Sequence, residues 1–141
     1  MKETKTRSGC PVSCSLDIWG DKWTLLIIRD LMMAKQCTYG DFLKSEEKIA
    51  TNILASRLQT LEENGMITKS NHPESKAKVL YTLTKKGIDL LPVMIEINLW
   101  AEKYLPIAAE RKEALKEVKK DKEKFIKSAM NDLKKGVVTS N

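Results

Sequence analysis

The feature of this sequence that most constrains its fold is a change of hydrophobic period at Gly65. Before this glycine, apolar residues recur at spacings that place them on one face of a helix over residues 51–64. They are Ile53, Leu54, Leu58 and Leu61. After it, residues 66–69 and 79–83 have the composition and alternation of strands, and the polar segment between them is typical of a turn. Gly65 lies where a left-handed C-cap would end the helix. The sequence therefore predicts a helix followed directly by a β-hairpin.

Further helices are predicted upstream of this unit. Apolar residues at spacings of three and four mark residues 11–34 as helical, and Asp21 is the expected N-cap of a second helix after an interruption at Gly20. Thr38, followed three residues later by Asp41, resembles the capping box of a short helix. A short helix, a turn at residues 46–50 and a capped helix form a helix-turn-helix, and the hairpin then forms its wing.

Downstream, Thr84 is expected to cap a long helix that Pro92 bends or restarts and that Pro106 ends. Residues 110–135 are highly charged but keep apolar residues at helical spacing, which predicts an amphipathic helix that needs a partner surface. We therefore predict a mainly α fold with a small β-hairpin wing: a winged helix-turn-helix with additional C-terminal dimerisation helices. Its parts are a polar N-terminal arm (1–9), the winged helix-turn-helix domain with its dimerisation helix (10–105) and a charged C-terminal helical tail (106–141).

The pattern predicts double-stranded DNA as a partner. The polar side of the helix over residues 51–64 is suited to reading base edges in a major groove, and basic residues near this helix and in the wing are suited to phosphates. The candidate base-reading residues are Thr51, Asn52, Ala55, Ser56 and Gln59, and the candidate phosphate contacts are Lys48, Arg57, Lys69, Lys76 and Lys78. The net charge of +6 agrees with an anionic partner. The competing interpretation is a solvated helix face beside an ordinary surface hairpin.

The sequence also argues against several other classes. No apolar run approaches the length of about 20 residues that spans a bilayer, and residues 1–9 do not resemble a signal peptide. Three cysteines are an odd number for a secreted disulfide scaffold, so we expect a cytoplasmic protein with free thiols and no membrane association.

No enzymatic function is predicted. The single histidine, His72, rules out a histidine-based triad elsewhere in the chain, and the sequence contains no glycine-rich phosphate loop. We expect no catalytic residue and no cofactor. Cys10, Cys14 and Cys37 together with His72 match no zinc-ribbon spacing, so no metal site is predicted.

An ordered set of short motifs resembles the HxlR family, a branch of the winged-helix MarR-like regulators. The resemblance covers about residues 10–105 and departs from the usual pattern at Asp21, Ala50 and Leu80, where the family has glycine, serine and glutamate. The matching segments are Cys10 to Val12, Gly20 to Trp23, Tyr39 to Phe42, Asn64 to Ile67, His72 to Glu74 and Val79 to Thr84.

This resemblance implies a homodimeric transcription regulator, by default a repressor, that binds an inverted-repeat operator. The first helix and the C-terminal helices would build the dimer, and a stable monomer would leave costly apolar stripes in water. The candidate interface residues are Leu16, Trp19, Ile95, Leu99, Trp100 and Tyr104. Their alternative role is in the intramolecular core. The rival function on the same fold is a protein–protein interaction module without specific DNA binding.

Cys10 is the candidate redox sensor. A thiol near a helix N-terminus and close in sequence to Lys5 and Arg7 is expected to be reactive. Relatives in the resembled family sense electrophiles or oxidants with a cysteine at this position, so we hypothesise that a small electrophile or oxidant acts as effector. The alternative is that Cys10 is a small packing residue. Cys14 and Cys37 are expected to be structural.

Overall fold

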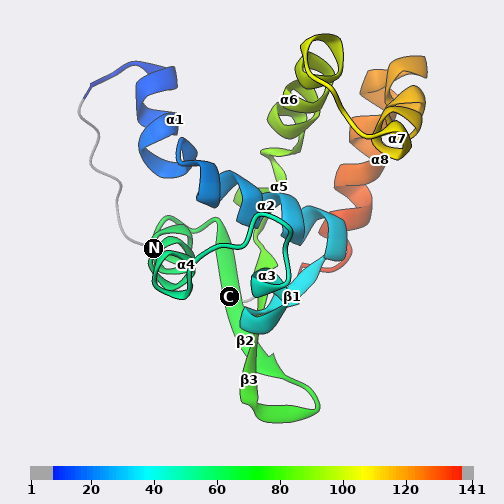
Figure 1. The fold of residues 1–141 in the computed structure, drawn as a ribbon. Helices are drawn as coiled ribbons and strands as arrows, with labels where there is room; N and C mark the ends of the chain where they lie inside the picture. Colours follow the sequence, from blue (N-terminus) through cyan, green and yellow to red (C-terminus); the bar gives the residue numbers. More distant parts are fainter. Residues whose placement is uncertain (1–7, 138–141) are drawn as a thin grey trace. The chain divides into compact units, whose positions relative to one another are not determined.

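The computed structural model describes residues 8–137 (Figure 1), and the chain divides into two compact units, Met1–Gly87 and Ile88–Asn141. The boundary between the units falls within the short helix α5 (Lys85–Ile88), whereas the sequence suggested a division near residue 105. The first unit contains α1 (Pro11–Trp19), α2 (Lys22–Ala34), β1 (Gln36–Thr38), α3 (Tyr39–Leu43), α4 (Thr51–Glu63), β2 (Ile67–His72) and β3 (Ser75–Leu83). The second contains α6 (Leu91–Tyr104), α7 (Ala109–Lys120) and α8 (Lys122–Lys134).

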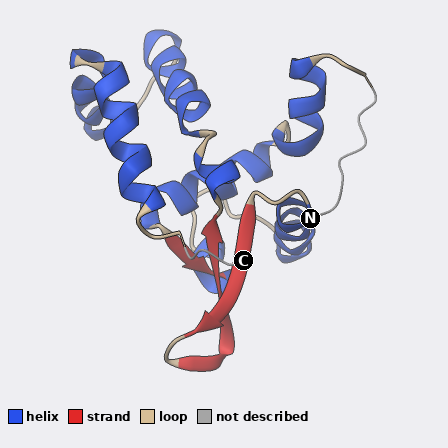
Figure 2. Ribbon diagram, turned by 180° about the vertical axis from the view of Figure 1, so that it is seen from behind, coloured by secondary structure: helices blue, strands red, loops and turns tan. Residues whose placement is uncertain are grey.

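The predicted fold class is confirmed, with one addition to the sheet. The strands β2 and β3 form the expected antiparallel hairpin, which Figure 2 shows extending away from the helices of its unit. The additional strand is β1, which pairs with β3 on the other side, so the strand order is β1-β3-β2. The strand β1 was not predicted, because it has only three residues and buries only Cys37.

The core of the first unit fixes the orientation of α4. Leu54 and Leu61 are fully buried and Leu58 nearly so, together with Ile28 of α2 and Phe42 of α3. Each such side chain contributes roughly 1.5–3 kcal/mol on burial. The face of α4 that was predicted to be apolar is therefore the face that packs inward, and the opposite face points to solvent.

The predicted helix ends are also confirmed. The Asp21 carboxylate accepts a hydrogen bond from the Thr24 backbone N–H at 3.2 Å, as an N-cap should. Thr38 and Asp41 exchange both bonds of the capping box. Gly65 has a φ of 71°, the left-handed conformation that favours glycine at the end of α4.

The second unit differs from the expectation of one tail helix. The chain breaks at Asp121, whose backbone is extended and whose carboxylate accepts from the Lys124 N–H at 3.1 Å to cap α8. This cap and the extended backbone stop α7 and start α8, so residues 110–135 form two helices. Pro92 behaves as predicted, because α6 restarts with this proline in its first turn. No helix within residues 8–137 is long and apolar enough to cross a membrane.

Within the second unit, the tail helices pack on α6. Leu115 and Val118 of α7 are buried. Ion pairs join Lys119 to Glu102 at 2.6 Å and Lys122 to Glu96 at 2.5 Å. Part of the partner surface that the tail was expected to need is therefore supplied by its own unit.

Candidate nucleic-acid interface

The structure gathers the five predicted base-reading residues on the outward face of α4. All five are exposed, and the inward positions between them are occupied by the buried leucines of the same helix. They are Thr51, Asn52, Ala55, Ser56 and Gln59. Gln59 donates a hydrogen bond to Glu63 at 3.1 Å along the helix surface. The face as a whole offers hydroxyl, amide and methyl groups, which are the groups that distinguish base pairs in a major groove.

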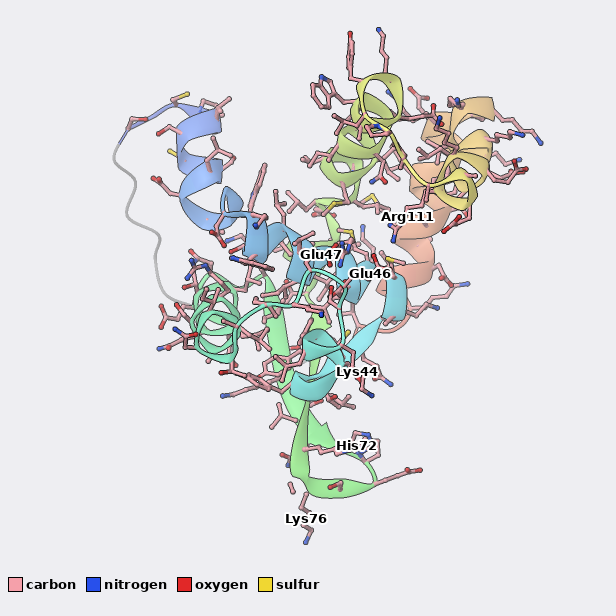
Figure 3. All side chains as sticks on the ribbon, in the orientation of Figure 1. Lys44, Glu46, Glu47, His72, Lys76 and Arg111 are labelled. Carbon is pink, nitrogen blue, oxygen red and sulfur yellow. The ribbon has the colours of Figure 1, made fainter. Side chains whose placement is uncertain are left out.

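The turn before α4 is held to α2 by Arg29. Its guanidinium donates to both carboxylate oxygens of Glu47, at 2.8 and 2.9 Å, and also to Asp30 and Ser45. The hydrogen bonds from Arg29, supplemented by one from Ser45, lower the pKa of the Glu47 carboxyl to about 2. This two-pronged contact fixes the turn of the helix-turn-helix, in which Figure 3 labels Glu46 and Glu47.

Two further bonds fix α4 itself. The Tyr39 hydroxyl of α3 donates to the Thr51 carbonyl at 2.6 Å. Arg57 Nε donates to Asp21 Oδ2 at 2.8 Å, which ties the middle of α4 to the first turn of α2. The hydrogen bond from Arg57 holds the pKa of the Asp21 carboxyl below its usual range.

The predicted phosphate contacts divide into two groups. Lys48, Lys69, Lys76 and Lys78 are exposed, although Lys69 also approaches Glu62 at 3.7 Å. Lys76 lies at the end of the hairpin, with its side chain pointing away from the sheet (Figure 3). Arg57 differs, because its guanidinium is engaged with Asp21 and is not a free surface cation.

Sequence reasoning missed the residues that position α4, namely Arg29, Tyr39 and Glu47. Arg29 and Glu47 are 18 residues apart and Tyr39 and Thr51 are 12 apart, so no periodic spacing links them. The only signal was an acidic residue within the predicted turn. Lys44, exposed at the C-cap of α3, is a further cation of the helix-turn-helix that was not predicted.

The three cysteines have different surroundings. Cys10 is exposed at the N-cap of α1, and Cys14 Sγ donates to the Ser8 carbonyl at 2.8 Å. Cys37 is buried in β1, and this burial raises the pKa of its thiol to about 12. Lys5 and Arg7, which are close to Cys10 in sequence, are outside the described residues. Among residues 8–137 there is no group of three or more His, Cys, Asp or Glu side chains placed to hold a metal ion.

The candidate dimer residues are not equally accessible. Trp100 and Tyr104 are 59% and 61% exposed, and their rings lie 5.2 Å apart on α6. Leu16 of α1 is 50% exposed, whereas Trp19 and Leu99 are half-buried. Ile95 is only 7% exposed, so its side chain belongs to the interior of the chain and is not available to a partner. Ile97 and Leu105, which were not predicted, are exposed on and just after α6.

A helix-turn-helix followed by a hairpin, with a third strand completing the sheet, defines the class: this is a winged helix-turn-helix transcription regulator. The HxlR-like helix-turn-helix family model matches residues 18–109, and the chain belongs to that family.

Individual relatives agree with this assignment. The chain is 36% identical over 96 residues to the HTH-type transcriptional regulator YdeP of Bacillus subtilis, covering 68% of this chain and 74% of YdeP. It is similar to the crystal structure of PA1607, with a TM-score of 0.64 and 38% identity over 73% of this chain and 70% of that one. It also resembles the reduced form of the B. subtilis regulator YodB, with a TM-score of 0.57 and 30% identity over 69% and 95% of the two chains. YodB has been solved in diamide-treated and quinone-bound forms as well.

Proposed function

We propose that this protein is a sequence-specific DNA-binding repressor that acts as a homodimer on an inverted-repeat operator. The observation that carries the proposal is the exposed polar face of α4, which lies on the opposite side of the helix from Leu54, Leu58 and Leu61. A helix presented in this way fits the major groove, and its amide and hydroxyl groups match the hydrogen-bonding edges of the bases.

The wing supplies the sequence-independent part of the binding. Lys76 and Lys78 are exposed on the hairpin, Lys69 lies on its other strand, and Lys48 precedes α4. Lysines that neutralise phosphates release condensed counterions, so the affinity for DNA should fall steeply as salt rises. The wing and the turn before α4 would then flank the groove that α4 enters.

The dimer is supported by the apolar surface of α6. Trp100 and Tyr104 expose large aromatic rings, and Leu16 exposes an apolar side chain on α1. Burying such surfaces against a second copy removes them from water. A two-fold dimer would present two copies of α4 about 34 Å apart, the spacing of half-sites on one side of a duplex.

We further propose that chemical modification of the Cys10 thiol switches operator binding. Cys10 is exposed at the start of α1, so a small reagent can reach its sulfur. The related regulator YodB has been solved with bound quinone and after diamide treatment. With a quinone, the Cys10 thiolate would add to a ring carbon, forming an S–C bond while the ring gains the proton. With diamide, the Cys10 thiols of the two subunits would lose their hydrogens to the N=N bond, which becomes the hydrazine, and would form a disulfide between the subunits.

The proposed function is tested by selecting duplexes from a randomised DNA library with the full chain. A gel shift of the selected duplex at two salt concentrations then measures the salt dependence. We expect an inverted-repeat sequence to be enriched and its affinity to fall steeply between 50 and 200 mM salt, by about a thousandfold for six phosphate contacts. Failure to enrich any duplex would contradict the proposal and would favour a winged-helix module that binds protein.

The thiol switch is tested separately with Cys10→Ser. We expect diamide or a quinone to change the affinity of the wild type for the selected duplex and to leave Cys10→Ser unchanged. Cys14→Ser is the matched control, since Cys14 lies one helical turn away on the same helix. A response that persists in Cys10→Ser, or is absent from the wild type, contradicts the switch.

A further inference from the structure

Arg57 occupies an unusual place for a basic residue in a DNA-reading helix. It lies on α4 directly after Ser56, one of the exposed residues of the reading face. Its Nε nevertheless donates to Asp21 Oδ2, at the start of α2, at 2.8 Å. The side chains of Arg57 and Asp21 are 32% and 39% exposed, so the pair is partly shielded from solvent.

The Asp21 carboxylate that binds this guanidinium is itself held by the first turn of α2. Asp21 is the N-cap of α2, and the same oxygen that binds Arg57 also accepts from the Thr24 N–H and hydroxyl, at 3.2 and 3.4 Å. Thr24 is 1% exposed, and α2 continues into the core through Ile27 and Ile28. Asp21 therefore cannot follow Arg57 toward solvent without giving up the cap of a core helix.

The other end of the guanidinium contacts the reading face. Arg57 Nη1 donates to Ser56 Oγ at 3.3 Å. A guanidinium has no acceptor, so the serine oxygen is the acceptor in this bond. The hydroxyl hydrogen of Ser56 then remains free to donate outward. In a major groove it would pair with acceptors, which are N7 and O6 of guanine, N7 of adenine and O4 of thymine, and not with the amino group of cytosine.

We propose that Arg57 is a positioning residue for sequence recognition: anchored by Asp21, it sets the rotation of α4 and orients the Ser56 hydroxyl as a hydrogen-bond donor. This inference rests on the proposed DNA-binding function, and it replaces the earlier expectation that Arg57 contacts a phosphate. Asp21, at the junction of α1 and α2, would then affect base recognition through Arg57 without contacting DNA itself.

The two roles of Arg57 predict opposite effects of one substitution. Asp21→Asn keeps an oxygen that can cap α2 but removes the charge that holds Arg57. If Arg57 positions Ser56, Asp21→Asn relaxes base preference. If Arg57 were a phosphate contact held back by Asp21, the same change would free it and tighten binding to every sequence.

The experiment measures the affinity of the full chain for the library-selected duplex and for its single-base variants, at two salt concentrations. We expect Arg57→Gln, Asp21→Asn and Ser56→Ala to lose preference at the same base pair of each half-site, by about tenfold, with an unchanged salt dependence. The double variant Arg57→Gln with Ser56→Ala should lose no more than either alone. Arg57→Lys keeps the charge but not the fork of donors, so its base preference should lie between those of the wild type and Arg57→Gln.

Lys76→Gln at the wing is the matched control. It should weaken binding to all sequences equally. The magnitude of the slope of log affinity against log salt should fall by about one for each subunit, and so by about two for the homodimer. Thermal unfolding by circular dichroism verifies that each variant is folded. A lowered salt slope in Arg57→Gln with intact base preference, or tighter binding by Asp21→Asn, overturns the inference while leaving the proposed function standing. If the wild type selects no duplex, the proposed function fails, and this inference fails with it.

Discussion

Two arginines hold α4 and the turn before it in place through hydrogen bonds to α2 and to the turn. Arg29 and Arg57 are both basic residues near the candidate DNA surface, yet each is committed to a carboxylate of the protein itself. Their ion pairs are partly solvent-exposed, and such pairs contribute little to overall stability. Their main effect is on geometry, because a guanidinium with several donors can join more than two groups at fixed angles.

The Arg29–Glu47 contact should appear in the pH dependence of stability. The pKa of Glu47 is lowered from 4.5 to about 2 by its hydrogen bonds from Arg29 and Ser45. Since the folded pKa is below the unfolded one, the contribution is complete above about pH 4.5 and is lost as the pH falls toward 2. We expect Glu47→Gln to lower the free energy of unfolding at pH 7 by about 1 kcal/mol or less, since the pair is part-exposed. The difference from wild type should close in acid.

Urea denaturation at several pH values between 7 and 2.5 measures this difference. Glu46→Gln is the matched control, because Glu46 is the preceding residue, is exposed, and loses the same charge in this variant. The contrary result is that the free energies of unfolding of wild type and Glu47→Gln differ by the same amount at every pH down to 2.5. That result would show that the charge of the Glu47 carboxylate contributes nothing to stability.

At the scale of elements, the helix-turn-helix depends on short helices with well-defined ends. The helix α3 has only five residues, fewer than an isolated helix needs in water. Its capping box satisfies the backbone N–H of Asp41 and of Thr38, and Phe42 anchors it in the core. Loss of this cap should therefore affect the whole unit, since α3 cannot persist without its first turn.

Thr38→Ala removes the cap and should lower the free energy of unfolding by about 1 kcal/mol. Chemical denaturation followed by circular dichroism gives the value. Thr51→Ala is the control, because Thr51 is exposed and the N-cap position of α4 is Ala50. Equal stability of Thr38→Ala and wild type would mean that the capping box contributes nothing measurable.

The elements also show what a sequence can reveal. The helix α4, its C-cap and the hairpin were predictable because strong local signals agree: an apolar face, a left-handed glycine and an alternating strand. The reading face followed as the complement of the buried face. The strand β1 was not predictable, because three residues carry no period, and the break at Asp121 was hidden among charged residues that favour a continuous helix. The Asp21–Arg57 pair spans 36 residues and exists only once the chain has folded.

For the whole molecule, the aromatic surface of α6 should determine the oligomeric state. Trp100→Glu places a charge in the proposed interface, where burying it would be costly. We expect the variant to sediment as a monomer and to bind the selected duplex at least a hundredfold more weakly, since a single half-site loses the benefit of linkage. Lys112→Glu, an exposed charge change on α7, is the control and should remain dimeric. A wild type that sediments as a monomer, or a dimeric Trp100→Glu, would contradict this interface.

Because Cys37 is buried, the reactivity of its thiol reports how often β1 separates from β3. Its thiol is 3% exposed on a strand that pairs with the centre of the sheet, and its pKa is raised to about 12. A thiol-reactive reagent should therefore label the exposed Cys10 and the part-exposed Cys14 first, and Cys37 only at the rate at which β1 separates from β3. The rate of the slow phase, measured with and without operator DNA, would show whether DNA binding stabilises the pairing of β1 with β3, and no cysteine has to be engineered into the protein.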